Sequence, residues 1–432
     1  MHESKQEKET SMSQLMEEIL SRDNMTLAYK KVKANKGASG VDGISTDEIQ
    51  EYLKENWPSI KERIQKRKYK PQPVLRVEIP KPRGGVRKLG IPSVVDRIIE
   101  QAIVQVITPI VEPYFSDYSY GFRPGRRAQQ AVIKLLEYLN DGYTYIVDID
   151  LEKFFDNVPQ DKLMTLVGKI IGDPDTESLI SKYLKAGVMV KGKYEATNVG
   201  TPQGGNLSPI LSNIMLNELD RELEARGLNF VRYADDCVIA VGSSAAANRV
   251  MHTITKWIER KLRLKVNMTK TRVTKPSQLK YLGFGFVKMG DKWEARPHQD
   301  SVKNFERKLE KLTKRSWSIS MDERIKRLNW VIRGWINYYR IGKMKSNLTR
   351  IDGRLRTRMR IVIWKQWKRV RTRYAMLKKL GIIDWVAREG ANIRKGYWRC
   401  ARNPIIAKAI SAERLKKAGY FDSLDYYESV RV

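Results

Sequence analysis

The front part of the chain carries both helical and strand-like hydrophobic patterns. Apolar residues at helical spacing predict helices over 13–20, 24–35, 50–66, 96–111, 129–140, 208–226 and 245–262. Segments rich in branched and aromatic residues predict strands over 74–79, 86–89, 143–151, 230–234, 237–241 and 279–287. The first two of these strands are expected to pair as a hairpin across the Pro/Gly-rich turn at 80–85.

Beyond residue 301 the pattern is helical almost throughout. Mixed strands and helices in front with helices behind predict an α+β region followed by an all-helical module. No stretch of about 18 apolar residues predicts a membrane span. The N-terminal segment MHESKQEKETSMSQ is polar and does not resemble a signal peptide. We therefore expect no membrane partner.

Charge then narrows the choice of partner. The chain has 82 Lys and Arg residues against 49 Asp and Glu, a formal net charge of +33. Residues 301–432 hold 35 of these basic residues against 11 acidic ones, and seven of the ten tryptophans. So large an excess disfavours a compact fold unless a polyanion binds it. Nucleic acid is the expected partner, with an acidic membrane surface as the weaker alternative.

Two cysteines and three histidines exclude a disulfide framework and a multi-cysteine zinc site. The remaining candidates for metal chemistry are carboxylates. Asp148 and Asp150 share one face of a predicted strand, although either could be a cap or pair with a basic residue. Asp235 and Asp236 lie between two short predicted strands, where an ordinary turn is the simpler explanation.

Both acidic sites together favour another interpretation. Carboxylates that converge on one point repel each other unless a cation lies between them. Hard oxygen ligands suit Mg²⁺, which takes one or two carboxylates plus substrate phosphates. Two such ions about 4 Å apart activate an attacking hydroxyl and stabilise a leaving group. The sequence therefore suggests a magnesium-dependent phosphoryl-transfer site.

Several motifs, in order along the chain, resemble those of group II intron-encoded reverse transcriptase/maturases. YADD at 233–236 is similar to the central reverse transcriptase motif, and DLEKFFD at 150–156 to the first catalytic motif. The other similar segments are SYGFRPGR (119–126), TPQGGNLSP (201–209), LKYLGF (279–284), RGWINYY (333–339) and WKQWK (364–368). Residues 24–44 resemble the N-terminal extension of that family.

The resemblance implies a fold and a domain order. The fold would be a right-hand polymerase, with fingers and a palm built on an antiparallel sheet, followed by a helical thumb. The expected domains are 1–60, the N-terminal extension; 61–300, the fingers and palm; 301–375, the helical thumb/maturase domain; and 376–432, a basic DNA-binding-like segment.

It also implies a catalytic set. Asp150, Asp235 and Asp236 would hold two Mg²⁺ ions, with the Leu151 backbone carbonyl as a further ligand. The aromatic residue five positions after the aspartate, Phe155, selects Asp150 rather than Asp148, which becomes a supporting residue.

The nucleotide contacts follow in the same way. Lys81 and Arg87 would clamp the triphosphate, Gln203 would contact the nucleotide or template, and Lys270 would lie near the leaving pyrophosphate. Phe155 would lie under the sugar and exclude a 2′-hydroxyl. Each of these residues has a simpler alternative. Lys81 and Arg87 could be solvated hairpin residues, Phe155 a core phenylalanine and Lys270 a surface lysine.

Basic residues of the back part would bind nucleic acid: Arg354, Arg356, Arg358, Arg360, Lys365 and Lys368. Spacing by two puts the arginines on different sides of a helix, so they form no single basic stripe. A solvated helix is the alternative for some of them. Trp330 and Trp335 are expected in the core.

The implied function is RNA-directed DNA synthesis from a DNA primer on an RNA template with dNTPs. The chain would also bind its group II intron RNA to assist splicing, and copy it into target DNA by target-primed reverse transcription. The expected location is a ribonucleoprotein in the bacterial cytoplasm.

After residue 301 only Cys400 is available for a Cys/His-rich nuclease, so the resemblance is to endonuclease-lacking members, which insert into single-stranded or nicked DNA. A retron or defence reverse transcriptase, or a splicing cofactor that only binds RNA, are the alternatives. The oligomeric state does not follow from the sequence.

Overall fold

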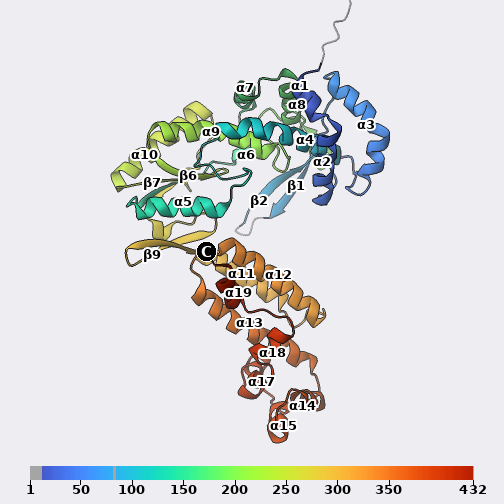
Figure 1. Ribbon diagram of the computed structural model, residues 1–432, viewed down its shortest axis with the longest axis vertical. Coiled ribbons are helices and arrows are strands. Elements are labelled where there is room, and N and C mark those ends of the chain that lie inside the picture. The colour runs from blue at the N-terminus through green and yellow to red at the C-terminus, as the bar shows by residue number, and fades with distance from the viewer. Residues whose placement is uncertain (1–11, 81–83, 432) are drawn as a thin grey trace, which may run out of the picture. The chain divides into compact units, whose positions relative to one another are not determined.

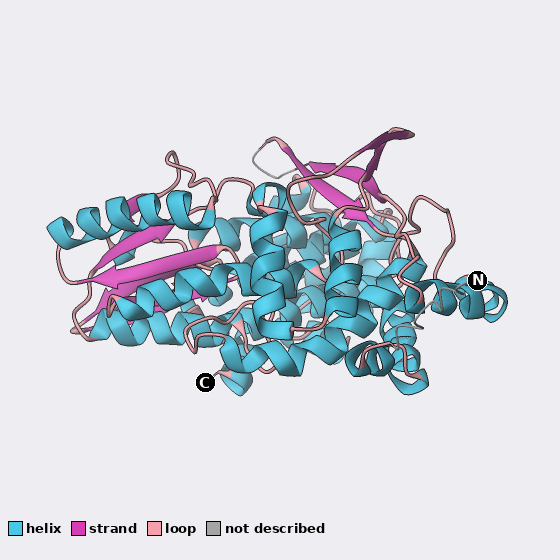
Figure 2. Cartoon of the chain, turned by 90° about the horizontal axis from the view of Figure 1, so that it is seen from above, coloured by secondary structure: helices cyan, strands magenta, loops and turns pink. Residues whose placement is uncertain are grey.

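The computed structural model describes residues 12–80 and 84–431, and the chain divides into two units, residues 1–274 and 275–432 (Figure 1). Within the described residues, the first unit combines helices with two four-stranded sheets, and the second has a two-stranded sheet followed by helices. Helices predominate, and the strands gather in a few small sheets (Figure 2). The predicted α+β region followed by a helical module is confirmed.

The first unit begins with the helices α1 (Gln14–Ile19), α2 (Arg22–Ala34), α3 (Ile49–Gln65) and α4 (Val94–Val111). The hydroxyls of Ser13, Ser21 and Ser93 accept backbone N–H groups from the first turns of α1, α2 and α4. These bonds satisfy donors that a helix leaves unpaired at its start. Helix α4 is mostly buried, with α1 and α2 packed against it. The predicted helices are confirmed to within a few residues.

The first sheet has the strand order β2-β1-β4-β5. Strands β1 (Val74–Pro80) and β2 (Val86–Ile91) form the predicted antiparallel hairpin, with Ile79 opposite Arg87. Strand β4 (Val188–Val190) pairs in parallel with β1, and β5 (Lys193–Glu195) pairs antiparallel with β4. Lys81 lies outside the described residues.

No helix or strand is predicted between residues 152 and 207, but the structure has α6 (Phe154–Asn157), α7 (Gln160–Ile171) and α8 (Pro174–Leu184) as well as β4 and β5 there. The sequence does carry boundary signals for these helices. Asp173 caps α8 by accepting the Thr176 N–H, with Pro174 at the first helical position. Gly172 ends α7 in the left-handed conformation.

The second sheet has the order β6-β7-β3-β8, formed by β3 (Tyr145–Ile149), β6 (Asn229–Tyr233), β7 (Asp236–Val241) and β8 (Arg272–Thr274). Helices α5 (Ala128–Asn140), α9 (Ser208–Ala225) and α10 (Ser244–Trp257) pack on it. Five consecutive residues of β7 are therefore buried, as in a strand covered on both faces. The antiparallel palm sheet that the resemblance implies is present.

A buried ion pair joins this sheet to α9. Arg232 of β6 and Asp220 of α9 both have fully buried side chains. The Arg232 guanidinium donates to both carboxylate oxygens of Asp220, at 2.7 and 2.5 Å. Two parallel hydrogen bonds to a carboxylate fix the orientation of an arginine as well as its position.

The second unit begins with the hairpin of β9 (Phe284–Met289) and β10 (Lys292–Pro297). The helices that follow are α11 (Gln299–Leu312), α12 (Met321–Tyr339), α13 (Lys345–Gln366), α14 (Val370–Lys379), α15 (Asp384–Ala391), α16 (Tyr397–Ala401), α17 (Pro404–Ala409), α18 (Ala412–Lys417) and α19 (Ser423–Val430).

The prediction of a strand over 279–287 is wrong in its first half. Leu282 and Gly283 have positive φ values of 49° and 81°, so the chain turns there and the strand begins only at Phe284. The hairpin of β9 and β10 lies within the second unit, residues 275–432. The Tyr338 hydroxyl donates to the Leu282 carbonyl, and the ring of Phe284 packs against Tyr339 at 4.8 Å.

The two tryptophans of α12 differ. Trp335 is partly buried and stacks on Phe305 at 4.3 Å between ring centroids, as predicted for a core residue. Trp330 is 63% exposed, so its assignment to the core is wrong. It lies on the outer side of α12 with Lys326 over its ring at 5.2 Å. A helical period alone does not tell which apolar residue faces outward.

Replacement of Arg232 by Leu is expected to destabilise the first unit by about 3–5 kcal/mol, because it leaves the Asp220 charge buried without a partner. The matched control is Lys54→Ala, which removes an exposed ion pair with Glu51 and should change stability little. Urea denaturation of the full chain, followed by circular dichroism, measures both. A midpoint for the Arg232 variant equal to that of the control would contradict the assigned role.

Candidate functional site

Two neighbouring strands bring the three predicted carboxylates together. In the antiparallel register of β3 with β7, Ile149 lies opposite Cys237 and Asp148 opposite Val238. The next pair in this register is Asp150 with Asp236, at the ends of the two strands. Asp235 precedes Asp236 in the turn between β6 and β7. Asp150 and the Asp235-Asp236 pair are therefore neighbours.

Hydrogen bonds and close backbone packing support the turn that carries Asp235. Ala234 has a positive φ of 55°, which is unfavourable for a residue other than glycine. The buried Arg232 guanidinium donates to the Ala234 carbonyl at 2.9 Å and to the Asn213 side chain at 3.1 Å. A Cβ atom on Gly121 would lie 2.2 Å from the Ala234 nitrogen. The motif at 119–126 thus supports the turn, and only glycine fits at 121.

Basic residues at the start of β8 and just before it pair with the acidic residues at the end of β3. Lys270 Nζ lies 3.1 Å from Asp150 Oδ2, and Arg272 Nε lies 3.7 Å from Asp148 Oδ2. The Asp150 N–H donates to the Thr271 hydroxyl at 3.1 Å. Asp148 thus has a basic partner, as a supporting residue should. Lys270 is 65% exposed but reaches the carboxylate that the resemblance selects.

Desolvation and mutual repulsion raise the pKa values of Asp235 and Asp236 in this cluster. Desolvation and the charges of Asp235, Asp148 and Asp150 raise the pKa of Asp236 to about 6, although the residue remains accessible to solvent. Desolvation also raises the pKa of Asp235, with Asp150 adding to the effect and the Arg87 charge opposing it. A cation placed among these carboxylates would relieve the repulsion and favour their charged forms.

A cleft of about 840 Å³ lies beside this cluster. Its lining includes five of the predicted site residues: Arg87, Asp150, Leu151, Gln203 and Lys270. They come from β2, from the end of β3, from the loop before α9 and from the loop before β8. Residues far apart in the sequence therefore line one cavity that carries both basic and acidic side chains.

Gln203 is positioned through its backbone. Its carbonyl accepts the Gly90 N–H of β2 at 2.6 Å. Gly204 has a φ of 119°, and a Cβ atom there would lie 2.4 Å from the Gly90 carbonyl oxygen. Close approach of two backbones thus requires glycine after Gln203, as the motif provides.

Phe155 lines a second, narrower cavity of about 280 Å³, which also includes Gln203. Its ring packs edge-on against Phe154 at 5.3 Å, and the residue is half-buried. Phe154 is only 2% exposed and belongs to the core. The core alternative therefore describes Phe154, while Phe155 packs partly on the core and partly faces the cavity.

Sequence reasoning missed one buried acid that shapes the site. Glu100 of α4 is 3% exposed and accepts the Asn206 N–H at 2.6 Å, which ties the 201–209 loop to α4. Burial, with some repulsion from Asp96, raises the pKa of Glu100 to about 8. The available signal was a pair of acids four residues apart on an otherwise apolar helix.

The oxygen donors fit a hard divalent cation. In the described part of the chain, no cluster of three or more His, Cys, Asp or Glu side chains forms a ready metal cage. Mg²⁺ does not require one, because it takes one or two carboxylates and completes its shell with water and substrate phosphates. Asp150, Asp235, Asp236 and the Leu151 carbonyl offer donors of this type.

The predicted nucleic-acid-binding arginines of α13 have partners within the second unit. Arg354 pairs with Glu310, Arg356 with Asp422 at 3.0 Å, Arg358 with the Thr313 hydroxyl at 2.6 Å, and Arg360 with the Ile410 carbonyl at 2.9 Å. Lys365 and Lys368 have no ion-pair or hydrogen-bond partner for their side chains among the described residues. The arginines thus help to hold the helices together, a role that the lysine side chains do not share.

Comparison with known proteins agrees with this geometry. The model of the family "Reverse transcriptase (RNA-dependent DNA polymerase)" matches residues 79–286, and that of "Group II intron, maturase-specific domain" matches residues 302–381. No helix in the described ranges is long and apolar enough to cross a membrane. Reverse transcriptases of this family generally use divalent metal ions.

Curated relatives point the same way. Protein YkfC of Escherichia coli is 32% identical over 60% of this chain and 76% of its own length. Group II intron-encoded protein LtrA of Lactococcus lactis is 29% identical over 66% of this chain, and the chain spans 61% of LtrA. The putative COX1/OXI3 intron 2 protein of Saccharomyces cerevisiae is 29% identical, with 64% of this chain and 39% of that protein covered.

Among solved structures, a partial Cas6-RT-Cas1–Cas2 complex matches 56% of this chain and 42% of that chain, at 23% identity and a TM-score of 0.36, which bears on neither fold nor function. The two family matches and the YkfC alignment establish the family of this chain. The chain belongs to the group II intron reverse transcriptase/maturase family and is an RNA-directed DNA polymerase with a maturase-specific domain.

Proposed function

We propose that Asp150, Asp235 and Asp236, with the Leu151 backbone carbonyl, hold two Mg²⁺ ions at which a primer is extended. The observation that carries this proposal is the antiparallel register of β3 with β7, which makes Asp150 a neighbour of the Asp235-Asp236 turn. When bound, the ions supply activation of the primer 3′-hydroxyl and stabilisation of the leaving pyrophosphate.

The residues of the cleft then bind and orient the nucleotide. Arg87, together with Lys81, contacts the triphosphate and offsets the negative charge on the transferred phosphoryl group. Lys270 is paired with Asp150 and lines the same cleft, so its ammonium group is within reach of the leaving phosphates. Gln203 contacts the nucleotide or template, and Phe155 lies under the sugar, where a 2′-hydroxyl would collide with its ring.

In this proposal, the second unit binds the RNA partner. The maturase-specific match at 302–381 and the excess of basic residues support binding of group II intron RNA. The polymerase copies an RNA template from a DNA primer, and does so at target DNA by target-primed reverse transcription. It works in a ribonucleoprotein with the intron RNA, in the bacterial cytoplasm.

Primer extension tests the catalytic set. Replacement of Asp235 and Asp236 by Asn is expected to reduce cDNA synthesis to background, because the metal-binding charges are removed. RNA affinity should stay unchanged, since the basic residues lie elsewhere. The measurements are primer extension with Mg²⁺ or EDTA and equilibrium RNA binding. The control is Asp141→Asn, at an exposed position after α5. Near wild-type extension by the double variant would refute the assignment.

Sugar selection tests Phe155. Its replacement by Val should raise incorporation of ribonucleotides relative to deoxynucleotides, because the barrier below C2′ is removed. The neighbouring Phe154→Val provides a matched control: it lowers stability, since Phe154 is buried, without altering the ratio. Single-nucleotide incorporation with dNTP and rNTP gives the ratio. If both variants discriminate as the wild type does, Phe155 has only a packing role.

Salt dependence tests the basic helix. Joint replacement of Lys365 and Lys368 by Gln should lower the slope of log affinity against log salt by roughly 0.7–0.9 for each phosphate that is no longer neutralised. The thermal midpoint should stay unchanged, because neither lysine side chain has a described partner. Arg356→Gln is the contrasting variant, and is expected to lower the midpoint because it breaks the ion pair with Asp422. An unaltered slope in the lysine variant would mean that both residues face solvent only.

A further inference from the structure

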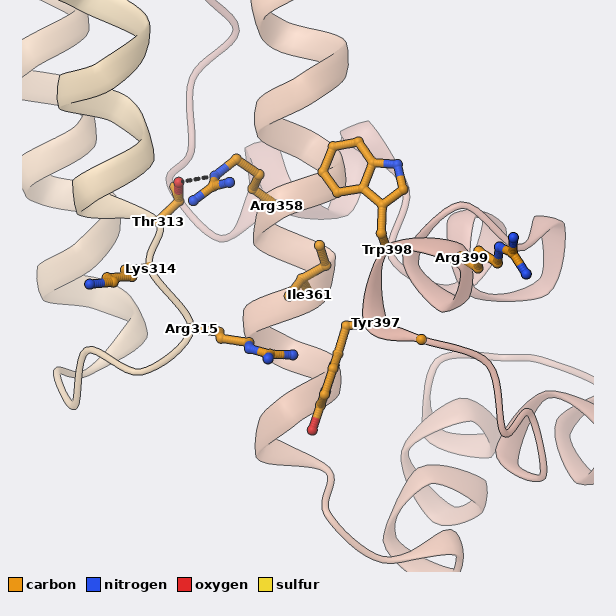
Figure 3. A pocket seen from close by; sticks show the side chains of 9 residues that line it. Thr313, Lys314, Arg315, Arg358, Ile361, Tyr397, Trp398 and Arg399 are labelled. Carbon is orange, nitrogen blue, oxygen red and sulfur yellow. Dashed lines mark hydrogen bonds between the residues drawn. The ribbon is translucent and has the colours of Figure 1, made fainter.

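A cavity of about 680 Å³ opens within the second unit, and none of the residues assigned above to catalysis lines it. It lies where α13, the segment after α11 and the start of α16 meet (Figure 3). Its lining residues are Thr313, Lys314, Arg315, Arg358, Ile361, Gly396, Tyr397, Trp398 and Arg399. Four of these are basic and none is acidic, so the cavity is suited to an anion.

Aromatic rings form one side of this cavity. In Figure 3, Trp398 and Tyr397 lie across from Thr313 and Lys314, with Ile361 between them, while the side chains of Lys314 and Arg399 point away. Trp398 is 42% exposed, and among the described residues its ring has neither an aromatic nor a cationic neighbour. The Arg315 guanidinium covers Tyr397 at 4.3 Å from the ring centroid. One large aromatic face therefore remains uncovered beside an apolar residue.

The cationic side is fixed in place. Arg358 donates from Nε to the Thr313 hydroxyl at 2.6 Å and from Nη2 to the Glu310 carbonyl at 2.9 Å. The segment after α11 is held by Arg324, which is 1% exposed and donates to the carbonyls of Trp317 at 2.7 Å and Lys314 at 3.3 Å. The wall that carries Arg315 is therefore pre-formed, which lowers the entropic cost of binding.

We propose that this cavity binds one unpaired nucleotide of a nucleic-acid strand, with its base stacked on Trp398 beside Ile361 and an adjacent phosphate between Arg358 and Arg315. The inference rests on the proposed function in so far as the chain handles nucleic acid. Aromatic rings bind bases of any sequence through stacking, and arginine pairs with phosphate oxygens. Bases within a duplex have no free face, so the ligand is a bulged, looped or terminal nucleotide.

An acidic peptide is the main competing ligand. It would use the arginines, but it would gain nothing from an uncovered indole next to an isoleucine. The combination of a flat apolar surface with the guanidinium groups of Arg315 and Arg358 matches a base with its phosphate more closely.

A double-mutant cycle on the full-length protein tests this proposal. Two RNA hairpins are compared, identical except that one bulged adenosine is replaced by an abasic nucleotide. Affinities are measured by fluorescence anisotropy in EDTA without dNTPs. For the wild type, removal of the base should weaken binding by about five- to 150-fold, the usual contribution of one stacked base. For Trp398→Ala the two hairpins should bind equally.

Further variants separate stacking from folding defects. Trp398→Phe should retain part of the preference for the base. Trp385→Ala removes a tryptophan that is 67% exposed on α15 outside the cavity, and should retain all of it. Arg315→Gln should weaken binding of both hairpins by the same factor, because the phosphate then has one cation fewer beside it. The same pair of hairpins in DNA distinguishes a DNA ligand from an RNA ligand.

The proposal is overturned if the wild type binds the two hairpins equally, if Trp398→Ala keeps the wild-type preference, or if an acidic peptide displaces the bulged hairpin as effectively as unlabelled RNA does. Primer extension by the wild type is measured separately. Absence of extension together with base-dependent binding would refute the proposed polymerase site alone, and the reverse result would refute only this cavity.

Discussion

The hydrogen bonds of Arg232 are the constraint on which the first unit depends. This buried guanidinium joins α9 through Asp220 and holds the carbonyl of Ala234, a residue in the left-handed conformation. Without it, the turn would relax and Asp235 would no longer lie next to the end of β3. A buried ion pair contributes little net stability over an apolar pair, but it fixes one geometry. Here that geometry brings like charges together.

The repulsion between those charges has to be offset locally. Lys270 pairs with Asp150, Arg272 with Asp148, and the charge of Arg87 acts on Asp235. Each partner comes from a different strand or loop, so the acidic cluster also connects β2, β3 and the segment before β8. Glu100 contributes in another way, because burial raises its pKa to about 8 and its carboxyl group can hold the 201–209 loop without adding a full negative charge at neutral pH.

In the second unit, arginine and lysine take different roles. The arginines of α13 bind carbonyls, a hydroxyl and carboxylates of other segments, as their multiple donors allow. Their positive charge still adds to the field of the unit, while Lys365, Lys368 and the Arg315–Trp398 region remain open to a ligand. A large net charge thus serves both cohesion and recognition of a polyanion.

Local pattern was sufficient for much of this protein. The strands that carry Asp150 and Asp235 have strong apolar patterns, and helices such as α4 and α5 have a clear period, so both follow from neighbours in the sequence. Motif order identified the family, and it predicted the three aspartates and the two glycines after Gln203. Short elements such as α6, β5 and the turn at Leu282 were missed or misplaced, because their boundaries depend on few residues.

Tertiary structure alone decided which polar residues meet. The partners Arg232 and Asp220 are twelve residues apart, Asp150 and Lys270 are 120 apart, and Glu100 and Asn206 are 106 apart. The sequence likewise gives no sign that Trp330 faces solvent, that Phe154 rather than Phe155 is the core ring, or that Arg358 and Trp398 line one cavity. Periodicity records a residue's relation to its own helix or strand, whereas burial and pairing depend on what the rest of the chain packs against it.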